Sequence, residues 1–255
     1  MHPIIALWSH PRSMSTATER LMRERGDLDC LHEPFMYDYY VHRARREMPH
    51  FEAQDDHPTR YEDIRDMLLA RAEAGPVFFK DMSYYVMPQI LEDRAFGGRL
   101  RNAFLIRNPI ASIASYYKLD PELTLEEIGL AAQWRHLEGL AAQGQTPPVI
   151  RAEDVRNDPQ GIMAALWRRL GLPYRAEAFD WQRQTPEDWA QVEGWHADVS
   201  QSKQIRPLTE AELRQQAENF EAAAAEAPHL RDFLAHEMPF HEKLSAHALT
   251  PETPP

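Results

Sequence analysis

The stretch that decides the fold is Ile4–Arg20, IIALWSHPRSMSTATER. An apolar run, Ile4–Trp8, is followed at once by small and polar residues and then by a segment that favours a helix. A short apolar run bounded by turn-forming residues is typical of a buried strand. The stretch therefore predicts a strand, a tight loop and a helix, the unit from which α/β proteins are built.

The loop between this strand and helix concentrates groups that bind anions. Its guanidinium and hydroxyl groups belong to Arg12, Ser13, Ser15 and Thr16. Together with backbone N–H groups at the positive end of a helix, such groups bind phosphate. Serine and threonine are also common at ordinary helix N-caps, which is the alternative interpretation. The loop is no Walker A motif, because its glycines and lysine are missing and Arg12 stands where the lysine is expected.

Length and composition limit the class of protein. The chain has 255 residues, of which 43% are hydrophobic, enough to bury one substantial core. We expect a single domain over residues 1–246 and a disordered, proline-rich tail over residues 247–255. The formal charge of −12 argues against broad binding to nucleic acids or anionic membranes, which depends on clustered Lys and Arg.

The sequence shows no signal for targeting to a membrane or for secretion and no pair of cysteines for a disulfide. The single cysteine, Cys30, excludes an internal disulfide, and neither a signal peptide nor an apolar run of about 18 residues is present. We therefore expect a soluble, cytoplasmic protein. The nearest approach to a zinc motif, His236–His241, has the wrong spacing and contains a proline, so the sequence predicts no metal site.

Later strands place more chemistry at one edge of the predicted sheet. Further strands are predicted over residues 29–34, 77–79, 102–106 and 148–154, with helices between them. Such alternation predicts a three-layer α/β/α protein with a parallel sheet. Glu33 and Lys80 lie where predicted strands end. Because ligands bind outside the carboxyl ends of parallel strands, we expect both residues to face the same space as the loop. The alternatives are a surface carboxylate for Glu33 and a solvated head on a buried stem for Lys80.

Two motifs carry a resemblance to a known family. Pro-Arg-Ser-x-Ser-Thr at residues 11–16 resembles the 5′-phosphosulfate loop of sulfotransferases that use 3′-phosphoadenylyl sulfate (PAPS), where Pro-[Lys/Arg]-Ser-Gly-[Ser/Thr]-[Ser/Thr] is typical. Met14 occupies the usual glycine position. If the loop needs positive φ there, Met14 carries strain of about 1 kcal/mol or more, and otherwise the loop path differs.

The second motif begins with Arg107-Asn108-Pro109 and continues to Ser115. It resembles the family's 3′-phosphate signature, in which the arginine and the serine eight residues later bind that phosphate. The resemblance implies the P-loop nucleoside-kinase-like sulfotransferase fold. It also implies binding of PAPS, or of its product adenosine 3′,5′-bisphosphate (PAP), by Arg12, Ser13, Met14, Ser15, Thr16, Ala17, Arg107 and Ser115. A late loop that closes over the nucleotide in this family is matched loosely by residues 195–203.

The resemblance also nominates catalytic residues. Cytosolic sulfotransferases have a histidine two residues after the lysine of the third strand, whereas Met82 stands at that position here. Carbohydrate-type sulfotransferases have a Glu-Pro after the second strand, which Glu33 matches. We therefore expect Glu33 to be the base, with His10 and His32 in reserve. Arg12 and Lys80 would offset charge on the leaving oxygen, without a metal.

The predicted activity is transfer of a sulfuryl group from PAPS to a hydroxyl or amine of a small-molecule or carbohydrate acceptor. A tyrosine-rich insertion at residues 36–58 is either a lid facing the acceptor or a solvated helix. Two alternatives remain open. One is a phosphotransferase using ATP, against which the missing lysine counts. The other is a protein that binds an adenine nucleotide without chemistry.

Overall fold

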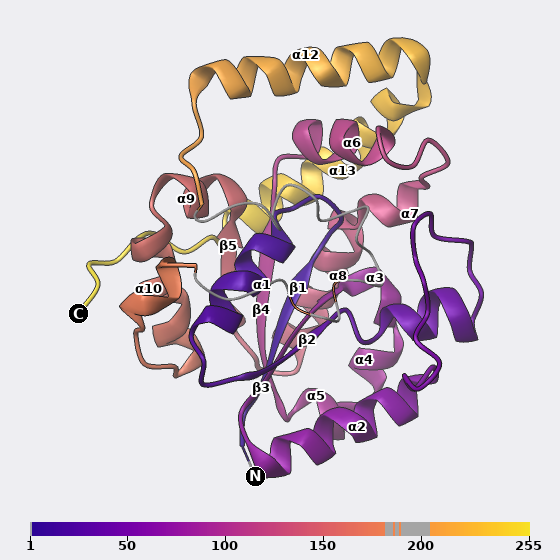
Figure 1. The fold of residues 1–255 in the computed structure, drawn as a ribbon. Coiled ribbons are helices and arrows are strands. Elements are labelled where there is room, and N and C mark those ends of the chain that lie inside the picture. The colour runs from indigo at the N-terminus through magenta and orange to yellow at the C-terminus, as the bar shows by residue number, and fades with distance from the viewer. Residues whose placement is uncertain (1, 182–185, 187–188, 190–204) are drawn as a thin grey trace.

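The predicted first strand is the central strand of a parallel sheet in the computed structural model, which describes residues 2–181, 186, 189 and 205–255 (Figure 1). The sheet has five strands in the order β2-β3-β1-β4-β5. They are β1 (Ile4–Ser9), β2 (Asp29–His32), β3 (Val77–Met82), β4 (Leu100–Ile106) and β5 (Val149–Arg151). Every strand pair is parallel, which confirms the predicted fold class.

Helices cover both faces of this sheet, as the alternating sequence predicts. The α-helices are α1 (Ser15–Glu24), α2 (Tyr61–Ala74), α3 (Ser83–Val86), α4 (Gln89–Glu92), α5 (Arg94–Gly97), α6 (Pro109–Tyr117), α7 (Leu125–Ile128), α8 (Leu130–Ala142), α9 (Ala152–Asn157), α10 (Pro159–Leu170), α12 (Glu210–Glu226) and α13 (His229–Ser245). Two short elements are the π-helix η1 (Asp38–His42) and the 3-10 helix η2 (Ala176–Phe179).

The core divides into two layers because side chains of a strand alternate between its faces. In β1, Ile4, Ala6 and Trp8 pack into the layer that includes residues of α2, α3 and α8. Ile5 and Leu7 pack into the opposite layer with residues of α1, α9 and α10. Both faces of β1 are therefore buried, which is why its sequence is continuously apolar rather than alternating.

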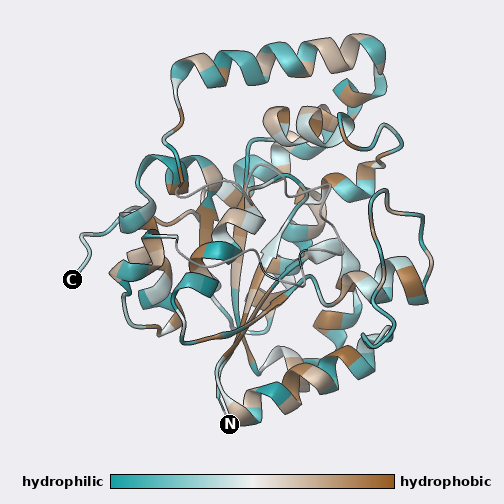
Figure 2. Ribbon diagram, in the orientation of Figure 1, coloured by the Kyte–Doolittle hydropathy of each residue, from teal (hydrophilic) through white to brown (hydrophobic). Residues whose placement is uncertain are grey.

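A third, smaller cluster joins α12 to α6 beyond the sheet. Phe220, Ala223 and Ala224 of α12 pack with Ile113 and Tyr116 of α6. Figure 1 shows α12 as the outermost helix at the top of the molecule, and Figure 2 shows its largely polar surface against the apolar strands at the centre. Of the described helices, none is long and apolar enough to cross a membrane.

Three predicted elements differ from the structure. The fifth strand ends at Arg151, and residues 152–154, predicted as its continuation, begin α9. After Thr124 the apolar spacing predicts one long helix through Leu125, Ile128, Trp134, Leu137 and Leu140. The structure has two helices there, because Gly129 takes φ 84° between α7 and α8. A Cβ at Gly129 would lie 3.0 Å from Cβ of His10, so this position favours glycine for space as well as conformation. The spacing of Thr59 and Glu62 also predicts a capping box, which is wrong, since α2 begins at Tyr61 without a side-chain cap.

The C-terminal tail, which we expect from the sequence to be disordered, has backbone contacts with the rest of the chain in the structure. Ala248 forms an isolated parallel bridge with Val149, and the N–H of Leu249 donates to the carbonyl of Val149 at 2.8 Å. Farther along, the N–H of Glu252 donates to the carbonyl of Gly161 at 3.0 Å. The proline-rich composition hid this, because the tail gains its backbone partners from β5 and α10 rather than from its own sequence.

Candidate functional site

The loop between β1 and α1 contains two non-glycine residues with positive φ, a conformation that is unfavourable for them. Met14 takes φ 69° immediately before α1, and Arg12 takes φ 61°. Positive φ is unfavourable for residues with a side chain, so the strain anticipated for Met14 is present. Within the loop, Ser13 is fully buried, and its hydroxyl has no hydrogen-bond partner among the described residues. A buried hydroxyl of this kind calls for a partner from outside the chain.

The two predicted binding motifs meet at this loop. The Arg12 side chain donates from Nε to the hydroxyl of Ser115 at 2.9 Å. The Arg107 guanidinium donates from Nη1 to the carbonyl of Arg12 at 2.8 Å. Residues about 100 positions apart therefore lie together at the carboxyl ends of β1 and β4. Ser15, Thr16 and Ala17 form the start of α1 beside them and are mostly buried.

This part of the sheet edge is crowded with positive charge. Burial lowers the pKa of Arg107; among the charges around it, Glu153 raises the pKa, whereas Arg12 and Arg156 lower it further. His10 is also buried, and burial together with His241 and Arg107 lowers its pKa to about 3. The neutral ring of His10 accepts the backbone N–H of Arg107 through Nε2 at 3.0 Å. An anion bound here would relieve the repulsion between the guanidiniums.

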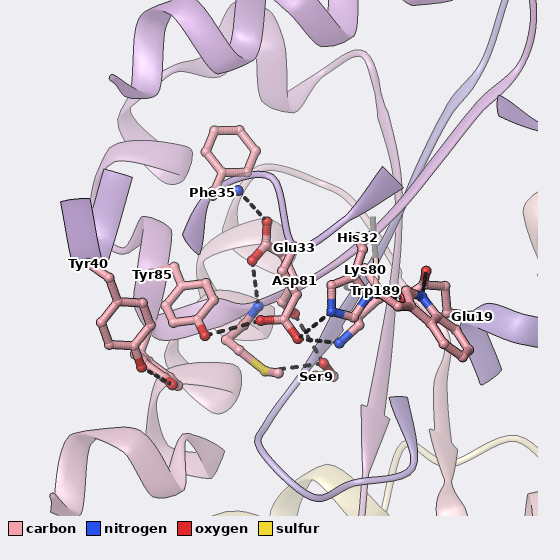
Figure 3. Close-up of polar contacts among 12 residues, drawn as sticks. Ser9, Glu19, His32, Glu33, Phe35, Tyr40, Lys80, Asp81, Tyr85 and Trp189 are labelled. Atoms are coloured by element: carbon pink, nitrogen blue, oxygen red, sulfur yellow. Dashed lines mark hydrogen bonds and ion pairs between the residues drawn. The ribbon is translucent and has the colours of Figure 1, made fainter. Parts of the chain in front are cut away.

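The predicted catalytic pair lies at the ends of β2 and β3. Glu33 and Lys80 form an ion pair, and their side chains are 6% and 1% exposed. Tyr85 donates its hydroxyl to Oε2 of Glu33 at 3.2 Å. Figure 3 shows the carboxylate of Glu33 between Tyr85 on one side and His32 and Lys80 on the other. The alternatives of a surface carboxylate and a solvated lysine head are both wrong, because both charged groups are buried.

A second layer of polar contacts surrounds this pair, and the sequence did not reveal it. His32 lies with Nδ1 2.6 Å from Oε2 of Glu19 and with Nε2 3.7 Å from Oε1 of Glu33. Oε1 of Glu19 accepts from Arg23 at 2.7 Å and from Trp189 at 2.8 Å. Glu19 was missed because α1 is buried almost all round, so no polar face of the helix marked it.

Beside the pair, Asp81 points to the opposite face of β3. Its carboxylate accepts the N–H of Phe35 at 2.8 Å and that of Met82 at 3.1 Å. Burial, reinforced by Glu33, raises the pKa of Asp81 well above its ordinary value. Its contact with the N–H of Phe35 holds the chain two residues after Glu33, so Asp81 supports the turn that carries the predicted base.

The tyrosine-rich insertion packs over this acid–base pair. The rings of Tyr39 and Tyr40 lie 5.3 Å and 5.5 Å from the ring of Tyr85. Farther along, Arg46 pairs with Asp120 at 2.7 Å and with Glu127 at 2.6 Å. The first part of the insertion is thus buried rather than a solvated helix, and Arg46 ties the segment to the loop after α6 and to α7.

The structure does not test two other predictions, the late loop over the nucleotide and the absence of a metal. The loop predicted at residues 195–203 lies outside the described residues. Among the residues that the structure describes, no group of three or more His, Cys, Asp or Glu side chains is placed to hold a metal ion.

The fold and this edge define the class: a three-layer α/β protein in which the two predicted phosphate motifs converge beside a buried Glu33–Lys80 ion pair. Residues 2–246 match the model of the sulfotransferase domain, so the chain belongs to that family.

Other known proteins are similar to this chain to different extents. The chain is 27% identical over 214 residues to the branched-chain-amino-acid aminotransferase-like protein 1 of Arabidopsis thaliana, covering 78% of this chain. It spans about a third of that relative's length (36%). Among solved structures, the sulfotransferase domain of the Synechococcus PCC 7002 olefin synthase is 16% identical with a TM-score of 0.49, covering 86% of this chain and 94% of its own. The sulfotransferase domain from the curacin biosynthetic pathway is 16% identical with a TM-score of 0.48, covering 89% and 97%.

Proposed function

We propose that this protein transfers a sulfuryl group from PAPS to a hydroxyl or amine of a small-molecule or carbohydrate acceptor. Membership of the sulfotransferase domain family supports the reaction class. The observation that carries the choice of donor is the contact of Arg12 with both Ser115 and Arg107. A site that grips a nucleotide at both its 5′ and 3′ phosphates needs these two motifs in one place.

The residues present fit such a donor. Ser13, with its buried hydroxyl and no described partner, and the backbone of Met14–Ala17 would hold the 5′-phosphosulfate at the start of α1. Arg107 and Ser115 would hold the 3′-phosphate, since a guanidinium binds phosphate through paired N–H groups. PAPS supplies an activated sulfuryl group with PAP as its leaving group. Arg12 lies between the two positions and would stabilise negative charge at either.

The acid–base pair would serve the acceptor. Glu33 would take the proton of the acceptor hydroxyl or amine as the new oxygen–sulfur or nitrogen–sulfur bond forms. Lys80 would stabilise the charge that develops on the oxygen leaving sulfur. The insertion at residues 36–58 would cover the acceptor as a lid, with Tyr39 and Tyr40 keeping the pair away from water.

Nucleotide preference tests the choice of donor. Isothermal calorimetry with PAP, AMP and ATP plus Mg²⁺ should give tightest binding for PAP. Removing the 3′-phosphate leaves Arg107 and Ser115 without a ligand, so AMP should bind at least about tenfold more weakly. A preference for ATP with Mg²⁺ would instead support the phosphotransferase alternative and overturn the proposal.

Substitution of the base separates an enzyme from a binding protein. Glu33→Gln keeps the shape of the side chain but cannot take a proton, so sulfation should fall by about 10²-fold or more. PAP affinity should change by less than about threefold, because Glu33 lies outside both phosphate motifs. Wild-type protein that binds PAP yet sulfates nothing in a screen of alcohols, phenols, sugars and amines with labelled PAPS would favour the binding-protein alternative.

The proposal includes a single domain over residues 1–246, a cytoplasmic location and no nucleic-acid partner. One cysteine suits a reducing compartment, and a net charge of −12 disfavours nucleic acids. Fractionation of cells that make the protein, followed by detection in the soluble fraction, tests the location.

A further inference from the structure

Oε1 of Glu33 faces two different partners. Lys80 forms an ion pair with this oxygen, and Nε2 of His32 lies 3.7 Å from it. The side chains of His32 and Glu19 are both fully buried, and Nδ1 of His32 is 2.6 Å from Oε2 of Glu19. A carboxylate accepts but does not donate, so the hydrogen between these atoms belongs to Nδ1. A neutral ring in this arrangement presents the lone pair of Nε2 toward Glu33.

Burial keeps the ring of His32 neutral. The pKa of His32 is lowered well below its ordinary value, chiefly by burial and then by Lys80 and Arg23, while Glu33 acts in the opposite direction. A ring that holds a proton so poorly is a poor base, which argues against His32 as the reserve base. The same ring is a good acceptor for a hydrogen bond from a neutral acid.

Resting on the proposed function, we propose that Glu33 exchanges Lys80 for His32 when it takes the acceptor's proton, and that Glu19 positions His32 for this exchange. The acceptor O–H or N–H bond breaks, its electron pair forms the bond to sulfur, and the proton goes to Oε1 of Glu33. The sulfur–oxygen bond of PAPS breaks, and its electron pair leaves with PAP. The new carboxylic acid O–H then donates to Nε2 of His32.

The exchange couples proton transfer from the acceptor to stabilisation of the leaving oxygen. While Glu33 is charged, its carboxylate holds Lys80. Once Glu33 is neutral, that ion pair is lost, and the ammonium is released at the moment when charge develops on the leaving oxygen. The hydrogen bond from the new acid to His32 also stabilises the product of the proton transfer. His32 and Glu19 are therefore positioning residues that act through Glu33.

A pair of substitutions at His32 tests which ring nitrogen matters. The amide of glutamine reaches the position of Nε2, whereas the shorter amide of asparagine reaches that of Nδ1. We expect His32→Gln to keep kcat within about tenfold of wild type, and His32→Asn to lose at least a further tenfold. PAP affinity should stay within threefold in both. Equal loss in both variants, or better activity in His32→Asn, would overturn the exchange.

The role of Glu19 has a readout that needs no catalysis. In the protein without nucleotide, ¹⁵N NMR of histidine side chains should show His32 protonated on Nδ1 and not on Nε2 at neutral pH. In Glu19→Gln the preference should weaken, since the amide can donate to Nδ1 as well as accept from it, and kcat should fall about tenfold or more at unchanged KM for PAPS. Wild-type His32 protonated on Nε2 would refute the proposal even if no variant folds.

A matched control shows whether Glu19→Gln acts by releasing His32 or merely by removing a buried carboxylate. Glu237 on α13 is 1% exposed and accepts the N–H of Ala131 at 2.9 Å, and α13 carries neither member of the acid–base pair. Glu237→Gln should therefore leave kcat within about twofold. Failure of the proposed function is a different result: wild type would then sulfate no acceptor, whereas failure of the exchange leaves an active wild type whose Glu19→Gln form is equally active.

Discussion

The two halves of the sheet's carboxyl edge differ in how their charged side chains are paired. At the ends of β1 and β4, Arg12 and Arg107 stand close together, and the pKa of Arg107 is lowered by burial and by like charges. At the ends of β2 and β3, Glu33 and Lys80 neutralise each other in a buried pair. The first half thus brings together guanidiniums that repel each other, whereas the second is balanced within the chain. We call the half at β1 and β4 the basic half and the half at β2 and β3 the acid–base half. The basic half is the proposed ligand site, and the acid–base half is proposed to move a proton.

A further difference is the cover over each half. The acid–base half lies under the insertion, through contacts of Tyr39, Tyr40 and Arg43 with Tyr85. Arg46 anchors the insertion through its ion pairs with Asp120 and Glu127. We therefore expect the stability of the protein and the protection of Glu33 to depend on Arg46.

Breaking this anchor should have the largest effect. Arg46→Gln leaves the carboxylates of Asp120 and Glu127, which are 2% and 1% exposed, without their guanidinium. Loss of one partner from a buried ion pair costs about 3 kcal/mol or more. Urea unfolding should show a decrease of about that size in the free energy of unfolding. As a control, Arg231→Gln removes the exposed pair with Glu221 and should cost less than about 1 kcal/mol.

Substitution in the basic half should affect binding rather than stability. Arg107→Gln removes the paired donors proposed for the 3′-phosphate, so PAP should bind about 100-fold more weakly, equivalent to about 2.7 kcal/mol. Arg107→Lys should recover only part of this, because an ammonium binds phosphate without the paired geometry. AMP, which lacks the 3′-phosphate, should bind all three proteins equally within about threefold. Equal losses for PAP and AMP would show that Arg107 supports the loop and not the 3′-phosphate.

The sequence predicted one half of the edge better than the other. The motifs that contain Arg12, Arg107 and Ser115 are local, so their residue types reveal them and the parallel sheet then brings them together. Glu19 and Tyr85 reach the acid–base pair only through packing of α1 and α3 against the sheet, and nothing in their neighbouring residues marks them. The contacts of the tail could not be predicted for the same reason, since its partners lie on β5 and α10.

The buried, neutral side chain of His10 in the basic half predicts that the stability of the protein depends on pH. His10 has its pKa lowered to about 3 in the folded protein, whereas in the unfolded chain it titrates near its ordinary value of about 6.5. Between these values the unfolded chain binds one more proton, so His10 makes stability fall by about 1.4 kcal/mol per pH unit as the pH decreases below 6.5.

His10→Gln isolates this contribution, since the glutamine amide oxygen can still accept the N–H of Arg107. Urea unfolding of both proteins at pH 7.0 and 5.5 should show wild type losing about 1.4 kcal/mol more than the variant. Parallel losses would mean that His10 takes up a proton as readily in the folded protein as in the unfolded chain, so that at pH 5.5 the basic half would carry one more positive charge than its geometry indicates.

The smallest expected effect concerns the strain in the loop of the basic half. Met14 takes φ 69° and also packs against the apolar layer beside α1. Met14→Gly relieves about 1 kcal/mol of strain but loses that packing, so stability and PAP affinity should change little. Met14→Val keeps an apolar side chain yet is branched at Cβ, which makes positive φ still less favourable, and should cost about 1 kcal/mol or more with weaker PAP binding. If Met14→Val matched Met14→Gly in both measurements, the left-handed turn would not be the conformation that binds the nucleotide, and the basic half would have to rearrange before it could hold its ligand.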